Sequence, residues 1–143
     1  MSTEANKAIV LRYINELNQR NIAVIDELVA EDFRAMVRQG YTRNVTAFPD
    51  YFVQVEEIIA EGDKVVVVWN HRGTHRGEYD GISPTEKVII GRAISIYRVV
   101  DGHIVDSDGA WDQAAIWQHL GLIPDTTTIL NNFMKKTDGS SAE

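Results

Sequence analysis

The sequence predicts an α+β domain in which helices come first and a curved, mainly antiparallel sheet of four to six strands follows. Apolar residues recur at helical spacing in the first third of the chain. After Pro49 the pattern changes to strands rich in β-branched residues, which glycine-containing turns separate. One more short helical pattern follows the strands. This order predicts about three helices, gathered on one face of the sheet.

The first helix is predicted over residues 6–17, where apolar residues recur at helical spacing and Thr3 or Asn6 could cap the helix. A second, short helix is predicted over residues 22–30. Residues 40–48 could add a further turn or two before a proline, which pushes the residue preceding it toward an extended conformation. Residues 32–48 as a whole therefore form a linking segment in this interpretation.

Alternating and β-branched apolar residues predict the strands, at residues 51–60, 64–72, 88–100 and 103–111. The glycine-rich stretch 73–87 reads as a long connection. Apolar side chains alternate onto both faces of the two central strands, so both faces need cover. We expect the helices on one face and a second copy of the chain on the other, in a homodimer or tetramer.

A closing helix is predicted over residues 113–120, with Gly121 ending it. Asp112 is placed to cap this helix, and a role as a catalytic acid is the alternative. The sequence thus predicts one domain over residues 1–125 and an extension over residues 126–143. The extension has a short apolar patch followed by a polar tail, and we expect it to be partly mobile.

Composition narrows the possible functions. The chain has 143 residues, a net charge of −7 and no cysteine, which excludes disulfides and thiolate chemistry. Its cations are scattered, so nucleic acid is not an expected partner. No apolar run approaches the roughly 20 residues of a membrane span. We expect no membrane contact and a soluble, cytoplasmic protein.

Several phrases carry a resemblance to a known family. They are Ala47-Phe48-Pro49-Asp50, Glu61-Gly62-Asp63-Lys64-Val65, Gly73-Thr74-His75-Arg76-Gly77, Gly81-Ile82-Ser83-Pro84-Thr85, Tyr97-Arg98-Val99-Val100-Asp101-Gly102-His103-Ile104, and Trp111-Asp112 followed by Leu120-Gly121. In this order they resemble the SnoaL-like polyketide cyclases and ester cyclases, within the nuclear transport factor 2-like superfamily.

The resemblance implies a cone-shaped α+β barrel around one apolar pocket, and an intramolecular aldol closure of a polyketide-like carbonyl substrate without metal or cofactor. In such cyclases one aspartate on the last strand removes a proton next to a carbonyl and later protonates the alkoxide. Burial of a carboxylate in a dry pocket raises its pKa and so makes it a stronger base.

The sequence departs from this pattern at the expected catalytic aspartate, since alignment to the family places Gly109 there and Ser95 where a pocket histidine would lie. Asp108, and after it Asp106, are the nearest carboxylates and our candidate catalytic bases. A two-residue turn at 101–102 would set them opposite Ser95 and Tyr97, respectively. A three-residue loop with a bulge would set Ser107 opposite Ser95 and turn both aspartates away.

A second departure is the length of residues 32–48, which is shorter than the family's segment by roughly a dozen residues and predicts a more open pocket mouth. The remaining site candidates are aromatic or polar residues expected to line the pocket: Tyr13, Trp69, His71, His75, Ser95, Tyr97 and Trp111. For His75, a structural role in its loop is the alternative.

The spacing of His71 and His75 suits a helix rather than a strand, so we expect no metal site. The expected ligand is a small hydrophobic or aromatic substrate. A cofactor-independent hydroxylase, in which an electron-rich substrate itself reduces oxygen, and a non-catalytic binding protein are the alternatives to the cyclase.

Overall fold

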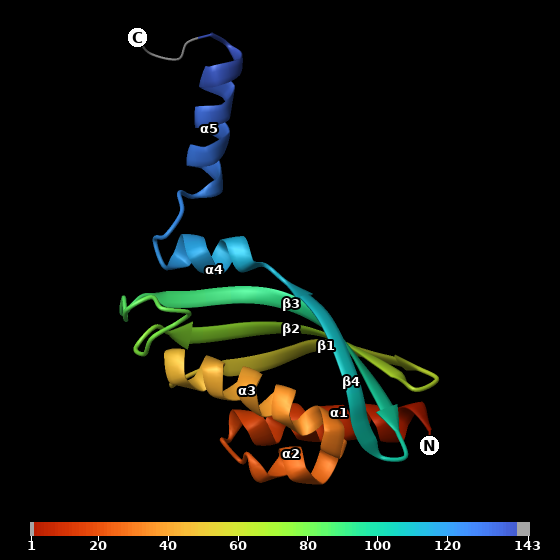
Figure 1. Cartoon of the computed structure of the whole chain (residues 1–143). Coiled ribbons are helices and arrows are strands. Elements are labelled where there is room, and N and C mark those ends of the chain that lie inside the picture. The colour runs from red at the N-terminus through yellow and green to blue at the C-terminus, as the bar shows by residue number, and fades with distance from the viewer. Residues whose placement is uncertain (1, 140–143) are drawn as a thin grey trace.

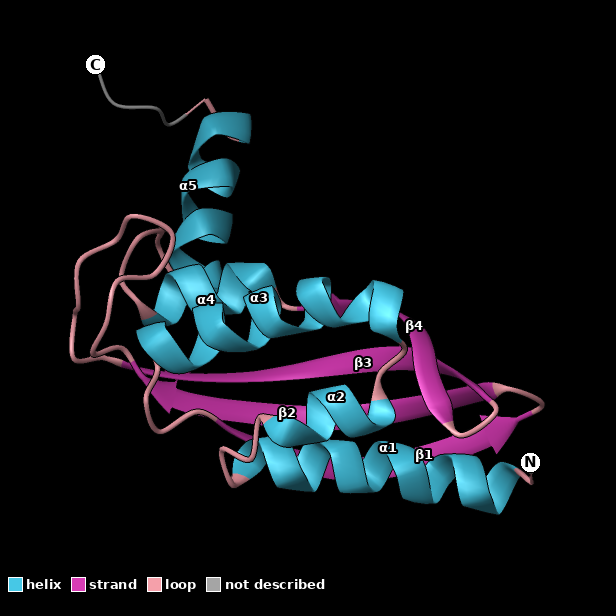
Figure 2. Cartoon of the chain, turned by 60° about the horizontal axis from the view of Figure 1, so that its bottom comes forward, coloured by secondary structure: helices cyan, strands magenta, loops and turns pink. Residues whose placement is uncertain are grey.

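The computed structural model describes residues 2–139 and confirms the predicted α+β class. Its elements are α1 (Thr3–Asn18), α2 (Ala23–Leu28), α3 (Glu31–Ala47), β1 (Phe52–Glu61), β2 (Lys64–Thr74), β3 (Val88–Val100), β4 (His103–Trp111), α4 (Gln113–His119) and α5 (Thr126–Thr137). Helices α1 to α3 lie together on one face of a curved sheet (Figure 1), and Figure 2 shows them from the helical side.

The four strands form one antiparallel sheet in the order β1-β2-β3-β4. Odd-numbered residues of β2 and β3, such as Val65, Val67 and Ile89, are buried beneath the helices on the concave face. Even-numbered residues such as Ile94 and Ile96 point to the convex face and are exposed. The two-sided apolar pattern thus buries one face and leaves the other open.

Two hydrophobic clusters hold the helices to the sheet. The first joins α1 and α2 to the sheet through residues such as Val10, Ile25 and Val65. The second gathers around Phe48 and Ile89 near the far end of β3, where α4 also packs. Residues of both clusters reach a cavity that is described below.

Helix α3 is much longer than predicted, so the short helical turn expected over residues 40–48 is wrong in extent. The helix begins at Glu31, where acidic side chains in the first turn favour a helix N-terminus. Phe33 and Val37 lie one turn apart and pack against the core. The helix contains Gly40 and several polar residues, which interrupt the apolar pattern and hide it in the sequence.

The predicted cap of α4 is correct and the predicted caps of α1 are wrong. Neither Thr3 nor Asn6 caps α1, because Ser2 does so by accepting a hydrogen bond from the Ala5 N–H at 3.1 Å. Asn6 is instead buried in α1. The predicted cap at Asp112 is confirmed, since its Oδ1 accepts from the Ala115 N–H at 2.9 Å.

The β3–β4 hairpin has the two-residue turn, with Val100 opposite His103. A bulge between Arg98 and Val99 then shifts the register by one residue, so both predicted sets of partners for Ser95 and Tyr97 are wrong. Beyond it Ser95 lies opposite Gly109, and Tyr97 opposite Ser107. Backbone geometry sets the position of this bulge, and no residue type in the sequence indicates it.

The extension contains α5, a helix that the sequence interpretation did not include. Asp125 caps it by accepting from the Thr128 N–H at 2.9 Å. No residue of α5 is buried, and Figure 1 shows the helix projecting away from the rest of the chain. The predicted mobility of the tail concerns in part residues 140–143, which lie outside the described residues.

No helix among residues 2–139 is both long enough and apolar enough to cross a membrane.

Candidate functional site

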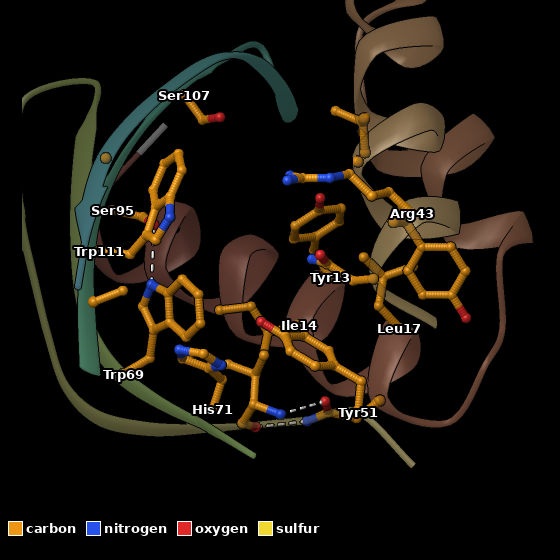
Figure 3. Close-up of a pocket in the computed structure, with 18 of the residues that line it drawn as sticks. Tyr13, Ile14, Leu17, Arg43, Tyr51, Trp69, His71, Ser95, Ser107 and Trp111 are labelled. Atoms are coloured by element: carbon orange, nitrogen blue, oxygen red, sulfur yellow. Dashed lines mark hydrogen bonds between the residues drawn. The ribbon is translucent and has the colours of Figure 1, made fainter. Parts of the chain in front are cut away.

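One cavity of about 620 Å³ lies between the concave face of the sheet and the helices α1 and α3 (Figure 3). Side chains from α1, α3, β2, β3 and β4 surround it. Cavities that hold small organic ligands typically measure about 300–1,000 Å³. The volume therefore lies within the range of small-molecule sites.

Aromatic rings make up much of the lining. They are Tyr13, Phe33, Tyr41, Phe48, Tyr51, Trp69, Tyr79, Tyr97 and Trp111. Tyr13 on α1 meets Tyr97 on β3 edge to face, with ring centroids 6.0 Å apart. Rings in such offset and edge-on arrangements present flat apolar surfaces, on which an aromatic ligand packs well.

The hydroxyls of Tyr13, Tyr51 and Tyr97 stay protonated over the physiological range. Burial raises the pKa of Tyr97 to about 12. Burial likewise raises the pKa of Tyr13 and that of Tyr51 above the ordinary value for a phenol. A protonated phenol donates a hydrogen bond, so these groups can stabilise a negative oxygen on a ligand without carrying charge themselves.

Trp69 and Ser95 are joined on the concave wall. The indole Nε1–H of Trp69 donates to Ser95 Oγ at 2.9 Å (Figure 3). Gly109 lies opposite Ser95, and a Cβ atom built there would stand 2.9 Å from the Ile94 carbonyl oxygen and 3.2 Å from Ser95 Oγ. Glycine therefore leaves the room that the serine hydroxyl occupies.

His71 is a buried cavity residue with an unused polar atom. It is 4% exposed, and its ring lies beside the rings of Trp69 and Tyr51, with centroids 5.6 and 5.7 Å away. Gly91 makes room for it, because a Cβ there would lie 2.1 Å from Nε2. Nδ1 is buried and has no hydrogen-bond partner within residues 2–139.

Burial lowers the pKa of His71 below its ordinary value of 6.5, so the ring is neutral at pH 7. A neutral imidazole has one nitrogen that accepts and one that donates. Leaving a buried polar atom unpaired costs about 1–3 kcal/mol, which a ligand hydrogen bond would offset.

Ser95 and Tyr97 lie on the concave wall, whereas the two candidate catalytic aspartates do not. Asp108 lies opposite Ile96, whose side chain is on the convex face, and its Oδ1 accepts from the Gly109 N–H at 2.8 Å. It contributes to the cavity lining and is the one acidic residue there among the described residues. Asp106 does not line the cavity, and its Oδ1 accepts from the Ser107 N–H at 2.9 Å.

Six of the seven predicted binding residues line the cavity, and one does not. Tyr13, Trp69, His71, Ser95, Tyr97 and Trp111 all line the cavity. His75 does not: it is fully buried beside Phe48, and its Nδ1 accepts from the Thr85 N–H at 3.2 Å. His75 thus lies in its loop, as in the alternative, but its ring pairs with Thr85 and not with a loop carbonyl.

Sequence reasoning missed the wall that α3 contributes. Phe33, Val37 and Arg43 line the cavity from this helix. Arg43 pairs with Asp80, and its guanidinium carbon lies 4.9 Å from the centroid of the Tyr79 ring. The helical spacing of the apolar pair Phe33 and Val37 is the signal that could have revealed this wall.

Within residues 2–139 no three histidine, aspartate or glutamate side chains gather closely enough to hold a metal ion.

The fold and its cavity define a class: a small α+β domain of the nuclear transport factor 2-like type, with one aromatic cavity between a curved sheet and its helices. The model of the SnoaL-like polyketide cyclase family matches residues 7–120. The chain belongs to this family.

Solved structures share the fold. AclR of Streptomyces galilaeus, provisionally assigned as a hydroxylase, is 23% identical, with a TM-score of 0.83 over 97% of this chain and 95% of its own. TsrD of Streptomyces laurentii is 16% identical, with a TM-score of 0.79 over 86% of this chain and 99% of its own. IdmH of Streptomyces antibioticus, provisionally assigned as a polyketide cyclase, is 23% identical, with a TM-score of 0.73 over 81% and 98%. No curated protein matches the chain.

Proposed function

We propose that this protein is a cofactor-independent hydroxylase of an electron-rich, polyketide-type aromatic substrate. The observation that carries the proposal is the chemistry of the concave wall. Where strand β4 meets this wall it presents Ser107 and Gly109, while the carboxylates of Asp106 and Asp108 each accept a hydrogen bond from the backbone N–H of the following residue. The wall offers neutral donors and one neutral imidazole in place of a carboxylate base.

The lining supports a flat substrate that carries phenol or carbonyl oxygens. Its aromatic side chains would pack against fused rings, while Tyr13, Tyr97 and Ser95 would direct hydroxyl groups toward oxygen atoms. The structural likeness to AclR, which is provisionally assigned as a hydroxylase, covers nearly the whole chain and adds support.

The proposed reaction uses the substrate as the source of all electrons. His71, neutral at pH 7, accepts a proton from a hydroquinone hydroxyl, and the resulting anion reduces O₂ and captures it at an adjacent ring carbon as a hydroperoxide. Cleavage of the O–O bond leaves one oxygen on the ring and releases the other as water. A hydroquinone and one O₂ thus give a hydroxyquinone and one H₂O, with no external reductant. Hydrogen bonds from Tyr97 and Ser95 would stabilise the anion.

Ring closure by proton abstraction is the second candidate. It is favoured by His71, which lines the cavity and whose buried Nδ1 has no partner within residues 2–139, because a neutral imidazole can also remove a proton next to a carbonyl. In this case His71 replaces the aspartate that the family resemblance implies. Exchange of that substrate hydrogen for deuterium from the solvent would reveal the reaction.

The experiment that tests the first proposal follows 1,4-dihydroxynaphthalene under ¹⁸O₂. We expect the protein to raise oxygen uptake at least about 10-fold above the uncatalysed oxidation, a modest value for enzymatic catalysis. The product should be 2-hydroxy-1,4-naphthoquinone with one ¹⁸O atom, and the other ¹⁸O should appear in water. Oxygen uptake that yields peroxide without ¹⁸O in the quinone would contradict hydroxylation. Ligand binding with neither oxygen uptake nor deuterium exchange would leave the non-catalytic binder.

A paired substitution tests whether the aspartates take part. Asp108→Asn and Asp106→Asn keep size and an acceptor oxygen but remove the basic carboxylate. Because neither carboxylate is directed at the concave wall, we expect kcat and KM for both variants to stay within about twofold of the wild-type values. A loss of roughly 10²-fold in kcat for Asp108→Asn alone would instead show that Asp108 is the general base.

A further inference from the structure

The charged side chains that line the cavity are few and mostly basic. Within the described residues they are Arg20, Arg43 and Asp108. The lining thus carries one excess positive charge at pH 7, where His71 is neutral. The whole chain, in contrast, has a net charge of −7. A pocket whose charge is opposite to that of the molecule favours a ligand with a negative group.

Arg20 is not available to such a ligand, because backbone carbonyls already occupy its guanidinium. Its Nη1 and Nη2 groups donate to four carbonyl oxygens at 2.8–3.4 Å, those of Leu17, Asn18, Pro49 and Tyr51. A guanidinium has five N–H groups in all. Arg20 therefore ties the end of α1 to the segment before β1 and has a structural role.

Arg43 on α3 is held from one side only. Asp80 accepts hydrogen bonds from its Nε at 2.8 Å and from its Nη2. The Tyr79 ring centroid lies 4.9 Å from the guanidinium carbon, and the Tyr79 hydroxyl accepts from Nη2 at 3.4 Å. Nη1 has no hydrogen-bond partner within residues 2–139. Its two N–H groups are thus available to a ligand, on a side chain that its neighbours already orient.

The Arg43 side chain lies at the mouth of the cavity. It lines the cavity and is 44% exposed, and Figure 3 shows it extending from α3 into the cavity. Asp80 does not line the cavity, so its carboxylate binds the guanidinium from outside the ligand space. The N–H groups of a guanidinium point to different sides, so one arginine can bind two carboxylates at once.

We infer that Arg43 binds a carboxylate of the substrate. The inference rests on the proposed function for the ring system and adds to it the substrate class: an aromatic hydroquinone that carries a carboxyl group. A charge-assisted hydrogen bond from arginine to a carboxylate is shorter and stronger than a bond to a neutral oxygen. Arg43 is therefore a specificity residue, which selects the acid and takes no part in the oxidation.

The two ends of the cavity suit the two ends of such a substrate. His71 is 4% exposed and so lies in the interior, whereas Arg43 lies at the mouth. A ring that places its hydroxyl group near His71 can direct a carboxylate substituent outward to Arg43. At the mouth the carboxylate keeps part of its hydration, which avoids the large cost of burying a charge completely.

Binding of two redox-inert ligands tests the inference without any turnover. The ligands are 3-hydroxy-2-naphthoate and 3-hydroxy-2-naphthamide, which share the ring system and differ in charge. By titration calorimetry at pH 7 we expect the carboxylate to bind at least about 10-fold more tightly than the amide, since hydrogen bonds to charged groups are the stronger ones. Added salt should weaken carboxylate binding and leave amide binding nearly unchanged.

Three variants assign this preference to Arg43. Arg43→Gln should weaken carboxylate binding at least about 10-fold and amide binding far less. Arg38→Gln is the matched control, because Arg38 is a half-exposed arginine of the same helix that pairs with Asp26 and does not line the cavity. It should leave both affinities within about twofold of the wild type, as is usual for exposed ion pairs. Asp80→Asn removes the competing carboxylate and should strengthen carboxylate binding about two- to fivefold.

The outcomes separate this inference from the proposed function. Equal affinity for the two ligands, a preference for the carboxylate that Arg43→Gln leaves intact, or binding of neither ligand would each overturn the inference. An Arg43-dependent preference without oxidation of 1,4-dihydroxynaphthalene or 1,4-dihydroxy-2-naphthoate would support the acid site and contradict the hydroxylase. Where oxidation occurs, Arg43→Gln should raise KM for the naphthoate and leave kcat within about twofold, as expected for a residue that only binds.

Discussion

Replacement of Gly77 by alanine is expected to lower the free energy of unfolding by about 3 kcal/mol or more, because it forces two backbone segments apart. A Cβ at Gly77 would lie 1.9 Å from the Thr46 carbonyl oxygen and 2.9 Å from its carbon. The N–H groups of Arg76 and Gly77 both donate to the Ala47 carbonyl at 3.0 Å. Those bonds tie the loop after β2 to the end of α3, so neither segment can move away freely.

Gly40→Ala is the matched control for this prediction. Nothing lies within 4 Å of a Cβ built at Gly40, in the middle of α3. Alanine is the better helix former by about 0.8–1 kcal/mol, so this variant should be slightly more stable than the wild type. Urea unfolding followed by circular dichroism measures both variants. A Gly77→Ala protein within about 0.5 kcal/mol of the wild type, the usual range for surface changes, would contradict the close approach seen here.

His71→Phe is expected to lower kcat for the hydroxylation by roughly 10²-fold or more, the usual contribution of a general base. The same change removes the unpaired Nδ1 but places a longer ring beside Gly91, so a stability cost of up to about 1–3 kcal/mol is expected, and kcat is compared for folded protein. Oxygen uptake with 1,4-dihydroxynaphthalene measures the first effect, and urea unfolding measures the second. Undiminished oxygen uptake would exclude His71 as the base.

His75→Phe is expected to lower stability and to leave activity unchanged. His75 accepts hydrogen bonds in its loop and does not line the cavity. Its replacement leaves the Thr85 N–H unpaired and should cost about 1–3 kcal/mol of stability. The activity of the folded protein should remain near that of the wild type.

The pH dependence of stability tests the burial of His71 directly. The pKa of His71 is lower in the folded protein than its ordinary value of 6.5, so the unfolded chain binds more protons below that pH. Wild-type stability should therefore fall as the pH drops through 6.5 toward the lowered pKa of His71. In His71→Phe this part of the fall should be absent. An identical pH dependence in both proteins would contradict the burial of a neutral imidazole.

The sheet could be predicted well because its signals are local. The bounds predicted for the last two strands, 88–100 and 103–111, agree with the structure, since valine-rich and isoleucine-rich runs end at an Asp-Gly turn. Helix α3 could not be predicted in full, because Gly40 and the polar residues around it weaken the helical pattern. Packing of Phe33 and Val37 against the core decides its conformation.

The candidate site was predictable for the strands and less so for the helices. Alternation along β2 and β3 places Trp69, His71, Ser95 and Tyr97 on the cavity side, as expected. The side on which Asp108 lies depends on a bulge near the hairpin, which shifts every later residue of β4 by one place.

The hydrogen bonds of Asp106 and Asp108 bear on how the molecule avoids aggregation. In the described part of the chain β4 is an edge strand of the sheet, and beyond the bridge between Val29 and Ile104 no further strand pairs with its outer side. The N–H groups of Ser107 and Gly109 donate instead to the two aspartates, which also place negative charge along the open edge. An open edge with unpaired donors is a template for strand addition by another chain. The two carboxylates thus oppose edge-to-edge growth along β4.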